Sequence, residues 1–171
     1  MLKRFLPGEY AKSVFHIYPH FLKEKGIKGI ITDLDNTLVE WDRPNATPKL
    51  KNWFEMMEQN GIKVTIVSNN NEKRVRSFSE PLNIPFISKA GKPRAKAFKK
   101  AAEQMGLKKE EVVVVGEQLL TDVLGGNLCG FHTILVVPVS STDGFWTRIN
   151  RKIERKILKL LKQKGMLHWE E

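Results

Sequence analysis

Five short runs of β-branched and other apolar residues recur along this chain, and segments with helical periodicity separate most of them. The runs cover residues 27–32, 62–67, 84–87, 112–115 and 133–137. Near-continuous Val and Ile content is typical of strands buried on both faces of a parallel sheet. Strands that alternate with helices form βαβ units, and their crossovers are right-handed. We therefore predict a doubly wound, Rossmann-like α/β fold with a five-stranded parallel sheet.

The segments between these runs carry the helical patterns. We expect helices at residues 48–60, 71–80 and 93–105, and a shorter helix after Glu117. A chain of 171 residues has the size of one domain with a real core. Because no repeat, low-complexity tract or linker interrupts the pattern, we expect residues 1–171 to form a single domain.

The C-terminal part of the chain predicts one long amphipathic helix at about residues 145–164. Its apolar face holds Trp146, Ile149, Ile153, Ile157, Leu160 and Leu161. Its other face holds the cations Arg148, Arg151, Lys152, Arg155, Lys156, Lys159, Lys162 and Lys164 against the single acid Glu154. Such a stripe fits packing against the domain and also fits binding at a membrane surface, and the two can coexist.

Composition restricts the partners and the compartment. The formal net charge of +10 favours anionic partners, namely nucleic acid, acidic lipid or phosphorylated substrates. The single cysteine, Cys129, allows no internal disulfide and fits a reducing compartment. The chain lacks a clean signal-peptide pattern, and no stretch approaches the roughly 20 apolar residues that span a bilayer. We expect a cytoplasmic protein without a transmembrane segment.

Polar residues follow four of the expected strands directly. They are Asp33-Leu34-Asp35-Asn36-Thr37, Ser68-Asn69-Asn70, Lys92-Pro93, and Gly116-Glu117 with Asp122 beyond it. In open parallel sheets, ligands bind at the carboxyl ends of the strands, so these residues should meet. Two unit charges about 4 Å apart interact by about 4 kcal/mol at an effective dielectric of about 20, so converging acids need a cation among them. Oxygen ligands without His or Cys suggest Mg²⁺.

The same residues supply what phosphoryl transfer requires. Ser68 and the backbone N–H groups of the next helix can hold phosphoryl oxygens, and Lys92 adds a compact positive charge. Acids provide a nucleophile and an acid/base. Each feature also has a purely structural interpretation. Asp33 and Asp35 could form a turn, the serine motif could cap a helix, Lys92 could be a surface lysine, and Asp122 could have no metal role.

The four motifs together resemble a known family. "DLDNT", "SNN", "KP" and "GEQLLTD" resemble motifs one to four of the haloacid dehalogenase (HAD) superfamily. Their order and spacing are similar to those of its subfamily IIIA phosphatases, the YqeG-like family, which is related to mitochondrial phosphatidylglycerophosphatases. The similarity covers nearly the whole chain and implies a HAD-type phosphoric monoester hydrolase.

The resemblance implies a role for each motif residue. Asp33 would attack phosphorus and form an aspartyl-phosphate, and Asp35 would act as the general acid and base. The substrate would be held by Thr37, Ser68, Asn69 and Lys92, with Lys92 also counted as catalytic. The Mg²⁺ ligands would be Asp33, Asp35 through its carbonyl, Glu117 and Asp122.

Glu117 departs from the family pattern. Motif four usually reads GDQ, whereas this chain has Gly116-Glu117-Gln118. Glutamate adds one carbon–carbon bond, roughly 1.5 Å, and ligands need placement within about 0.5 Å. We therefore expect weaker metal binding or slower turnover, unless the loop shifts or Asp122 takes over.

The chain has no room for the cap domain that many HAD enzymes carry. Residues 38–47 and 87–92 form connections that are too short for one. An uncapped site suits a phosphate presented on something large, and each Lys or Arg near an anionic membrane contributes about 1 kcal/mol. The leading expectation is phosphatidylglycerophosphate or another surface-presented substrate, with peripheral membrane contact through the basic C-terminal helix.

Two alternatives stay open at this point. One is a soluble phosphatase acting on nucleotides or sugar phosphates. The other is a weakly active HAD-fold protein that binds RNA or the ribosome through its basic tail.

Overall fold

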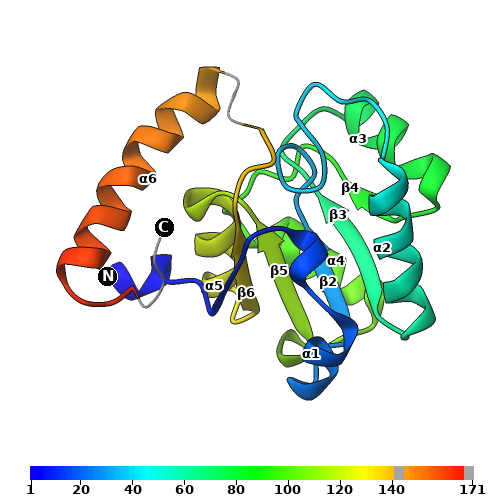
Figure 1. Cartoon of the computed structure of the whole chain (residues 1–171), viewed down its shortest axis with the longest axis horizontal. Helices are drawn as coiled ribbons and strands as arrows, with labels where there is room; N and C mark the ends of the chain where they lie inside the picture. The colour runs from blue at the N-terminus through cyan, green and yellow to red at the C-terminus, as the bar shows by residue number, and fades with distance from the viewer. Residues whose placement is uncertain (141–144, 168–171) are drawn as a thin grey trace.

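The computed structural model describes residues 1–140 and 145–167 of the chain, except for the side chains of Phe145 and Trp146. Its centre is a parallel sheet of six strands in the order β1-β6-β5-β2-β3-β4 (Figure 1). The strands are β1 (Glu9–Ala11), β2 (Gly29–Thr32), β3 (Lys63–Val67), β4 (Phe86–Ile87), β5 (Val112–Gly116) and β6 (His132–Val136). The doubly wound α/β class is thus confirmed.

The expected number of strands was one too low. The additional strand β1 pairs in parallel with β6, with Tyr10 opposite Leu135. It has only three residues, all partly buried, and its Glu-Tyr-Ala composition lacks the apolar run that marked the other strands. Its place in the sheet depends on the edge that β6 offers, which is information that a local pattern does not contain.

Six α-helices surround the sheet in the described part of the chain. They are α1 (Pro19–Glu24), α2 (Pro48–Gln59), α3 (Glu72–Ser79), α4 (Ala95–Met105), α5 (Leu124–Leu128) and α6 (Phe145–Gln163). A π-helical segment, Leu119–Val123, leads into α5, and 3₁₀ turns occupy Leu2–Phe5, Val14–His16, Glu80–Leu82 and Lys109–Glu111. The helix α1 was not expected, while the others match the sequence patterns within a few residues.

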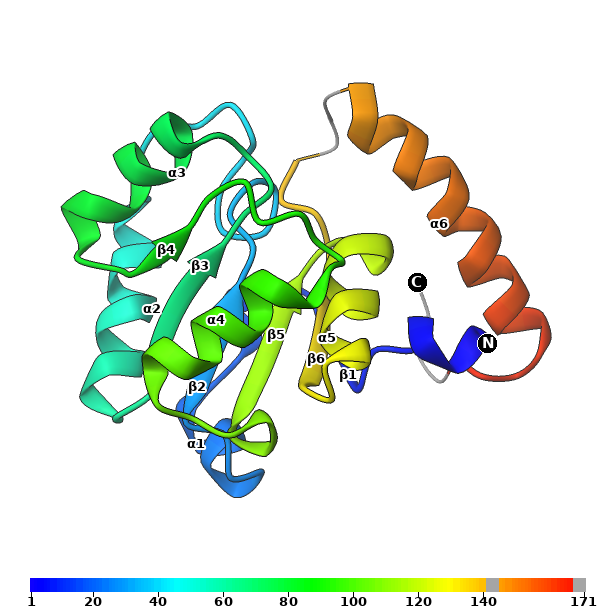
Figure 2. The same ribbon diagram turned by 180° about the vertical axis from the view of Figure 1, so that it is seen from behind.

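Both faces of the sheet are covered, as the Val/Ile-rich strands predict. Figures 1 and 2 show α2 and α3 on one side and α4 and α5 on the other. Adjacent residues of β2 point to opposite sides, since Ile30 packs with the α2 residues Leu50 and Met57, whereas Ile31 packs with Phe98 of α4. The central strands are therefore rigid supports for the loops that follow them.

The sheet order places the switch of winding direction between β2 and β5. From β2 the chain proceeds outward to β3 and β4, and then returns to β5 on the other side and proceeds to β6. Ligand sites in such folds lie at this switch point, outside the carboxyl ends of the strands. The segments 33–47 and 88–94 lead to α2 and α4 without an inserted domain, as expected.

The helix α6 lies at the β6 side of the sheet, beside the π-helical segment and the N-terminal turn, and not on either sheet face (Figures 1 and 2). Ile157 and Leu158 pack against a small cluster formed by Leu119, Val123 and Leu135. The expected apolar face is therefore only partly packed. Its member Leu161 is buried, whereas three others are exposed: Ile149, Ile153 and Leu160. The expected place of the Trp146 side chain on this face lies outside the described residues.

Within residues 1–140 and 145–167, no helix has the length and apolar character needed to cross a bilayer.

Candidate active site

A cavity of about 520 Å³ lies at the carboxyl ends of β2, β3 and β5. Its walls include Asp33, Asp35, Asn36, Trp41, Ser68, Asn69, Asn70, Lys92, Glu117, Gln118, Thr121 and Thr147. Another hollow of about 480 Å³ lies at the opposite end of β3, but it is mainly apolar and contains a single acid, Glu58. Polar residues from each of the four sequence motifs thus meet at one cavity, as expected from the parallel sheet.

Asp33 and Lys92 form the centre of the site. Asp33 follows β2, and its backbone N–H donates to Val115 O of β5 at 3.0 Å. Lys92 Nζ lies 3.1 Å from Asp33 Oδ1 and 2.7 Å from Asp122 Oδ1. Burial alone would lower the pKa of Lys92, but the carboxylates of Asp122 and Asp33 outweigh burial and raise it. The ammonium therefore stays charged between the two acids.

Asp33 is more accessible than its neighbours. Its side chain is 12% exposed, whereas those of Lys92 and Asp122 are each 2% exposed. Asp33 also lines the cavity, while Asp122 does not. Of the two acids that contact Lys92, Asp33 is therefore the one that a substrate can reach.

The motif Ser68-Asn69-Asn70 after β3 braces the neighbouring residues. Asn69 Oδ1 accepts the Lys92 backbone N–H at 2.8 Å, and Asn69 Nδ2 donates to Lys92 O at 3.3 Å. Ser68 Oγ accepts the Asn70 N–H at 3.1 Å, and Ser68 also lines the cavity. The turn interpretation of this motif and its position at a binding site are therefore compatible.

Gly116 at the end of β5 makes room for Asp122. A Cβ at position 116 would overlap the Asp122 carboxylate. The Gln118 N–H donates to Asp122 Oδ2 at 3.3 Å and fixes its second oxygen. The glycine of the motif thus allows a buried acid from the π-helical segment to reach Lys92.

Asp35 is held by Asn70, the last residue of the Ser68-Asn69-Asn70 motif, and by Arg74, which the sequence patterns did not single out. Asn70 Nδ2 donates to Asp35 Oδ2 at 2.9 Å. Arg74, in the first turn of α3, donates to Asp35 Oδ1 through Nε at 3.2 Å and Nη2 at 3.1 Å. Burial raises the pKa of the Asp35 carboxyl, while the bond from Asn70 opposes the rise. Both residues belong to the polar sequence "SNNNEKR", and their residue types alone do not indicate that either contacts Asp35.

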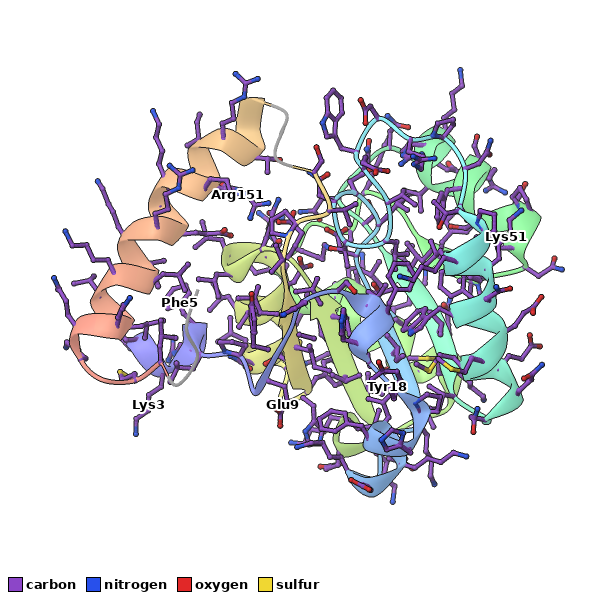
Figure 3. All side chains as sticks on the ribbon, viewed as in Figure 1. Lys3, Phe5, Glu9, Tyr18, Lys51 and Arg151 are labelled. Atoms are coloured by element: carbon purple, nitrogen blue, oxygen red, sulfur yellow. The ribbon has the colours of Figure 1, made fainter. Side chains whose placement is uncertain are left out.

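Glu117 is paired with a residue of the C-terminal helix. The guanidinium of Arg151 contacts the Glu117 carboxylate, donates to the Glu117 carbonyl at 3.2 Å, and reaches Glu154 Oε2 at 3.4 Å. In Figure 3, Arg151 extends from α6 toward the body of the molecule. Burial raises the pKa of Glu117 to about 8, and the charge of Arg151 opposes that rise. The glutamate that stands in place of the usual aspartate of motif four is therefore held by a residue of α6.

Thr37 lies apart from the cavity walls. Its side chain is buried, and its hydroxyl has no hydrogen-bond partner among the described residues. The adjacent Asn36 adopts a φ of 60°, and its side chain accepts the Trp41 N–H at 3.2 Å. The structure places Thr37 within the loop that carries Asp33 and Asp35, and does not bring it to the cavity with Ser68 and Asn69.

Comparisons with known proteins agree with these motifs. Residues 30–112 match the haloacid dehalogenase-like hydrolase family, and residues 89–138 match the HAD-hydrolase-like family. The probable phosphatase YqeG of Bacillus subtilis (strain 168) is 69% identical over 172 residues, which cover 100% of both chains. The chain belongs to the YqeG-like family of HAD phosphatases. The expected enzyme class is thereby confirmed.

One more distant relative of this YqeG-like phosphatase carries the name of a phosphatase, and a solved structure shows the same fold. Phosphatidylglycerophosphate phosphatase 1 of Arabidopsis thaliana is 27% identical over 171 residues, which cover 94% of this chain and 49% of the plant protein. The cobalt-bound deoxy-D-mannose-octulosonate 8-phosphate phosphatase of Haemophilus influenzae has the same fold. Its TM-score is 0.57 at 16% identity, and the match covers 80% of this chain and 90% of that one.

The charges of this YqeG-like phosphatase are more balanced than the sequence suggested. The four acids Asp33, Asp35, Glu117 and Asp122 are contacted by the cations Lys92, Arg74 and Arg151. Among the residues that the structure describes, no three acid, His or Cys side chains are close enough to hold a metal by themselves. The chain thus supplies much of the positive charge that we had expected from an ion.

Proposed function

We propose that this YqeG-like phosphatase hydrolyses a phosphate monoester through an aspartyl-phosphate on Asp33, with Mg²⁺ as its cofactor. The observation that carries the proposal is the accessible Asp33 carboxylate, held 3.1 Å from a buried, charged lysine at the cavity. A carboxylate fixed by a rigid strand end is a suitable nucleophile. The Lys92 ammonium can stabilise the negative charge that the phosphoryl oxygens carry.

The proposed reaction has two steps. An oxygen of Asp33 forms a bond to phosphorus while the bond from phosphorus to the ester oxygen breaks, and Asp35 protonates the leaving oxygen. Water then attacks phosphorus, Asp35 takes its proton, and the Asp33–phosphorus bond breaks to release inorganic phosphate. The raised pKa of Asp35 favours the protonated form that the first step needs. Arg74 and Asn70 would hold its carboxyl in position.

The donor set fits a divalent cation, although some donors have other partners in this structure. Carboxylate and carbonyl oxygens are what Mg²⁺ prefers, and Asp33, the Asp35 carbonyl, Glu117 and Asp122 would hold it. Asp33 and Asp122 share Lys92, and Glu117 is bonded to Arg151. Binding would therefore draw at least one carboxylate partly away from a cation of the protein. When bound, the ion would neutralise charge on the phosphoryl group.

The favoured substrate is a phosphate monoester exposed on an anionic lipid surface, with phosphatidylglycerophosphate as the specific candidate. Two observations support this choice. The segments where a cap could be inserted are short, and the half-exposed Trp41 forms part of the cavity wall. The 27% identical plant relative carries the name of a phosphatidylglycerophosphate phosphatase.

Phosphate release from a substrate panel tests this function. The panel contains phosphatidylglycerophosphate, a nucleoside monophosphate, a sugar phosphate and p-nitrophenyl phosphate, each with Mg²⁺ or EDTA. We expect Mg²⁺-dependent release with the highest kcat/KM for the lipid. Activity that persists in EDTA would contradict the cofactor, and equal rates for lipid and soluble esters would contradict the substrate class.

The variant Glu117→Asp tests why glutamate stands in motif four. The shorter side chain withdraws from Arg151, so we expect the Mg²⁺-dependent rate to stay equal or rise. We also expect a melting temperature a few degrees lower, because α6 loses one contact with the catalytic loop. The measurements are phosphate release across a Mg²⁺ titration and thermal unfolding. The exposed Glu110→Asp is the matched control. A large fall in the rate of Glu117→Asp at saturating Mg²⁺ would contradict the idea that glutamate is a poorer metal ligand than aspartate at this position.

A further inference from the structure

Three large aliphatic side chains stand exposed in one row on α6. Ile149 is 39% exposed, Ile153 is 45% exposed and Leu160 is 44% exposed. Their spacings of four and seven residues place them on one side of a helix with about 3.6 residues per turn. We call these three residues the α6 stripe. Since exposed hydrophobic residues normally occur singly, a row of three on one helix requires a reason.

The contacts of α6 prevent the stripe from turning inward. Leu161 is fully buried, and Glu154 Oε1 accepts the Leu120 N–H at 3.2 Å. Arg151 contacts Glu117. At about 100° per residue, Leu161 lies about 100°, Glu154 about 120° and Arg151 about 180° around the helix from the middle of the stripe, so rotation that buried the stripe would break all of their contacts. The helix is therefore fixed with the three stripe residues of its apolar face outward.

A row of lysines runs beside the stripe. Lys152, Lys156 and Lys159 are all exposed, and we call them the lysine row. Lys152 follows Ile149 by three residues and Lys156 follows Ile153 by three, so each lies next to a stripe residue on the helix surface. The outward side of α6 thus combines an apolar row with a cationic row, which is the pattern of helices that lie in a membrane interface.

The pattern distinguishes between possible partners. Single-stranded RNA is bound by cations together with aromatic side chains that stack on bases, and the α6 stripe is purely aliphatic. A second copy of this chain would bring two rows of cations together, which is unfavourable. An anionic lipid surface offers both acyl chains for the stripe and negative charge for the lysine row.

We propose that α6 binds an anionic lipid surface through the α6 stripe and the lysine row. This inference deepens the proposed function and rests on it for the identity of the substrate. Thr147 of α6 lines the active-site cavity, and Arg151 bonds to Glu117 within it. Ile149, the first residue of the stripe, therefore lies within one helical turn of a residue of the cavity wall, and binding through the stripe would bring the active-site end of α6 to the lipid surface.

Vesicle co-sedimentation of the full chain tests the proposal without any activity measurement. The vesicles contain phosphatidylcholine alone or phosphatidylcholine mixed with phosphatidylglycerol. We expect binding only to the mixed vesicles, and we expect it to weaken as salt rises. Equal binding to both vesicle types, or binding to neither, would overturn the proposal.

Two sets of substitutions separate the apolar from the ionic contribution. The first set is Ile149→Gln, Ile153→Gln and Leu160→Gln, and the second is Lys152→Gln, Lys156→Gln and Lys159→Gln. We expect each set to weaken binding to the mixed vesicles about tenfold or more. The control set is Lys96→Gln, Lys99→Gln and Lys100→Gln on α4, which are also exposed and cationic. We expect the control set to bind the mixed vesicles like the wild type. An equal loss of binding by the control set would show that binding depends only on the net charge of the protein.

Further measurements identify the other outcomes. All variants should keep the wild-type rate on p-nitrophenyl phosphate, because none of these residues lines the cavity. Binding to a single-stranded RNA but not to vesicles, or a dimer that the first set dissolves, would overturn the lipid assignment. Vesicle binding without faster lipid hydrolysis would contradict the proposed substrate and leave the docking surface standing. Lipid hydrolysis in detergent micelles without vesicle binding would support the proposed substrate and contradict the docking surface.

Discussion

Replacing Asp33 with asparagine should reduce phosphate release by about 10⁴-fold or more, which is the scale of losing an enzyme nucleophile. The amide has almost the same shape as the carboxylate, and Lys92 keeps its 2.7 Å contact with Asp122. We therefore expect the melting temperature of Asp33→Asn to change little. The loss would then reflect chemistry, because the fold and the charge of Lys92 remain.

The covalent intermediate gives this prediction a second readout. A substrate that carries a labelled phosphoryl group should leave label on the wild-type chain after rapid quenching in acid, and none on Asp33→Asn. The exposed Glu110→Gln removes one negative charge at the opposite end of the sheet and serves as the control. Label on Asp33→Asn, or wild-type turnover by it, would show that another group attacks phosphorus.

Much of the fold could be predicted because its signals are local. The runs of Val and Ile in β2, β3, β5 and β6 are buried on the sheet, and their alternation with helices is sufficient for a parallel topology. The position of the site followed from that topology alone, because polar motifs after parallel strands must share an edge. The strand β1 was missed because its three residues become a strand only through pairing with β6.

The partners of the site residues could not be predicted in the same way. Arg74 binds Asp35 from 39 residues away in sequence, and Arg151 binds Glu117 from 34 residues away. Arg151 is one of eight cations in the tail, and periodicity does not distinguish the one that turns inward. The packing of α6 through Leu161 and Glu154 makes that choice. The same packing turns Ile149 and Ile153 outward. Tertiary contacts, and not the apolar periodicity of the helix alone, therefore decide which side of α6 faces the domain.

Replacing Lys92 with methionine should destabilise the protein and also inactivate it. The ammonium lies between Asp33 and Asp122 with its side chain 2% exposed. Methionine fills a similar volume but leaves the buried Asp122 carboxylate without its cation. Removing one member of a buried pair costs about 3–5 kcal/mol. For a chain of this length we expect the melting temperature to fall by about 6–20 °C, and phosphate release to fall by about 10²-fold or more.

A second substitution separates the loss of stability of Lys92→Met from its loss of activity. Asp122→Asn removes the acid that Lys92 would leave unpaired, so Lys92→Met combined with Asp122→Asn should recover most of the melting temperature but none of the activity. The exposed Lys100→Met on α4 is the control and should melt like the wild type. Added Mg²⁺ should stabilise Lys92→Met more than the wild type, because a divalent cation can take the place of the ammonium among the acids. A double variant as unstable as Lys92→Met alone would show that packing, and not charge, is what Lys92 contributes at the end of this sheet.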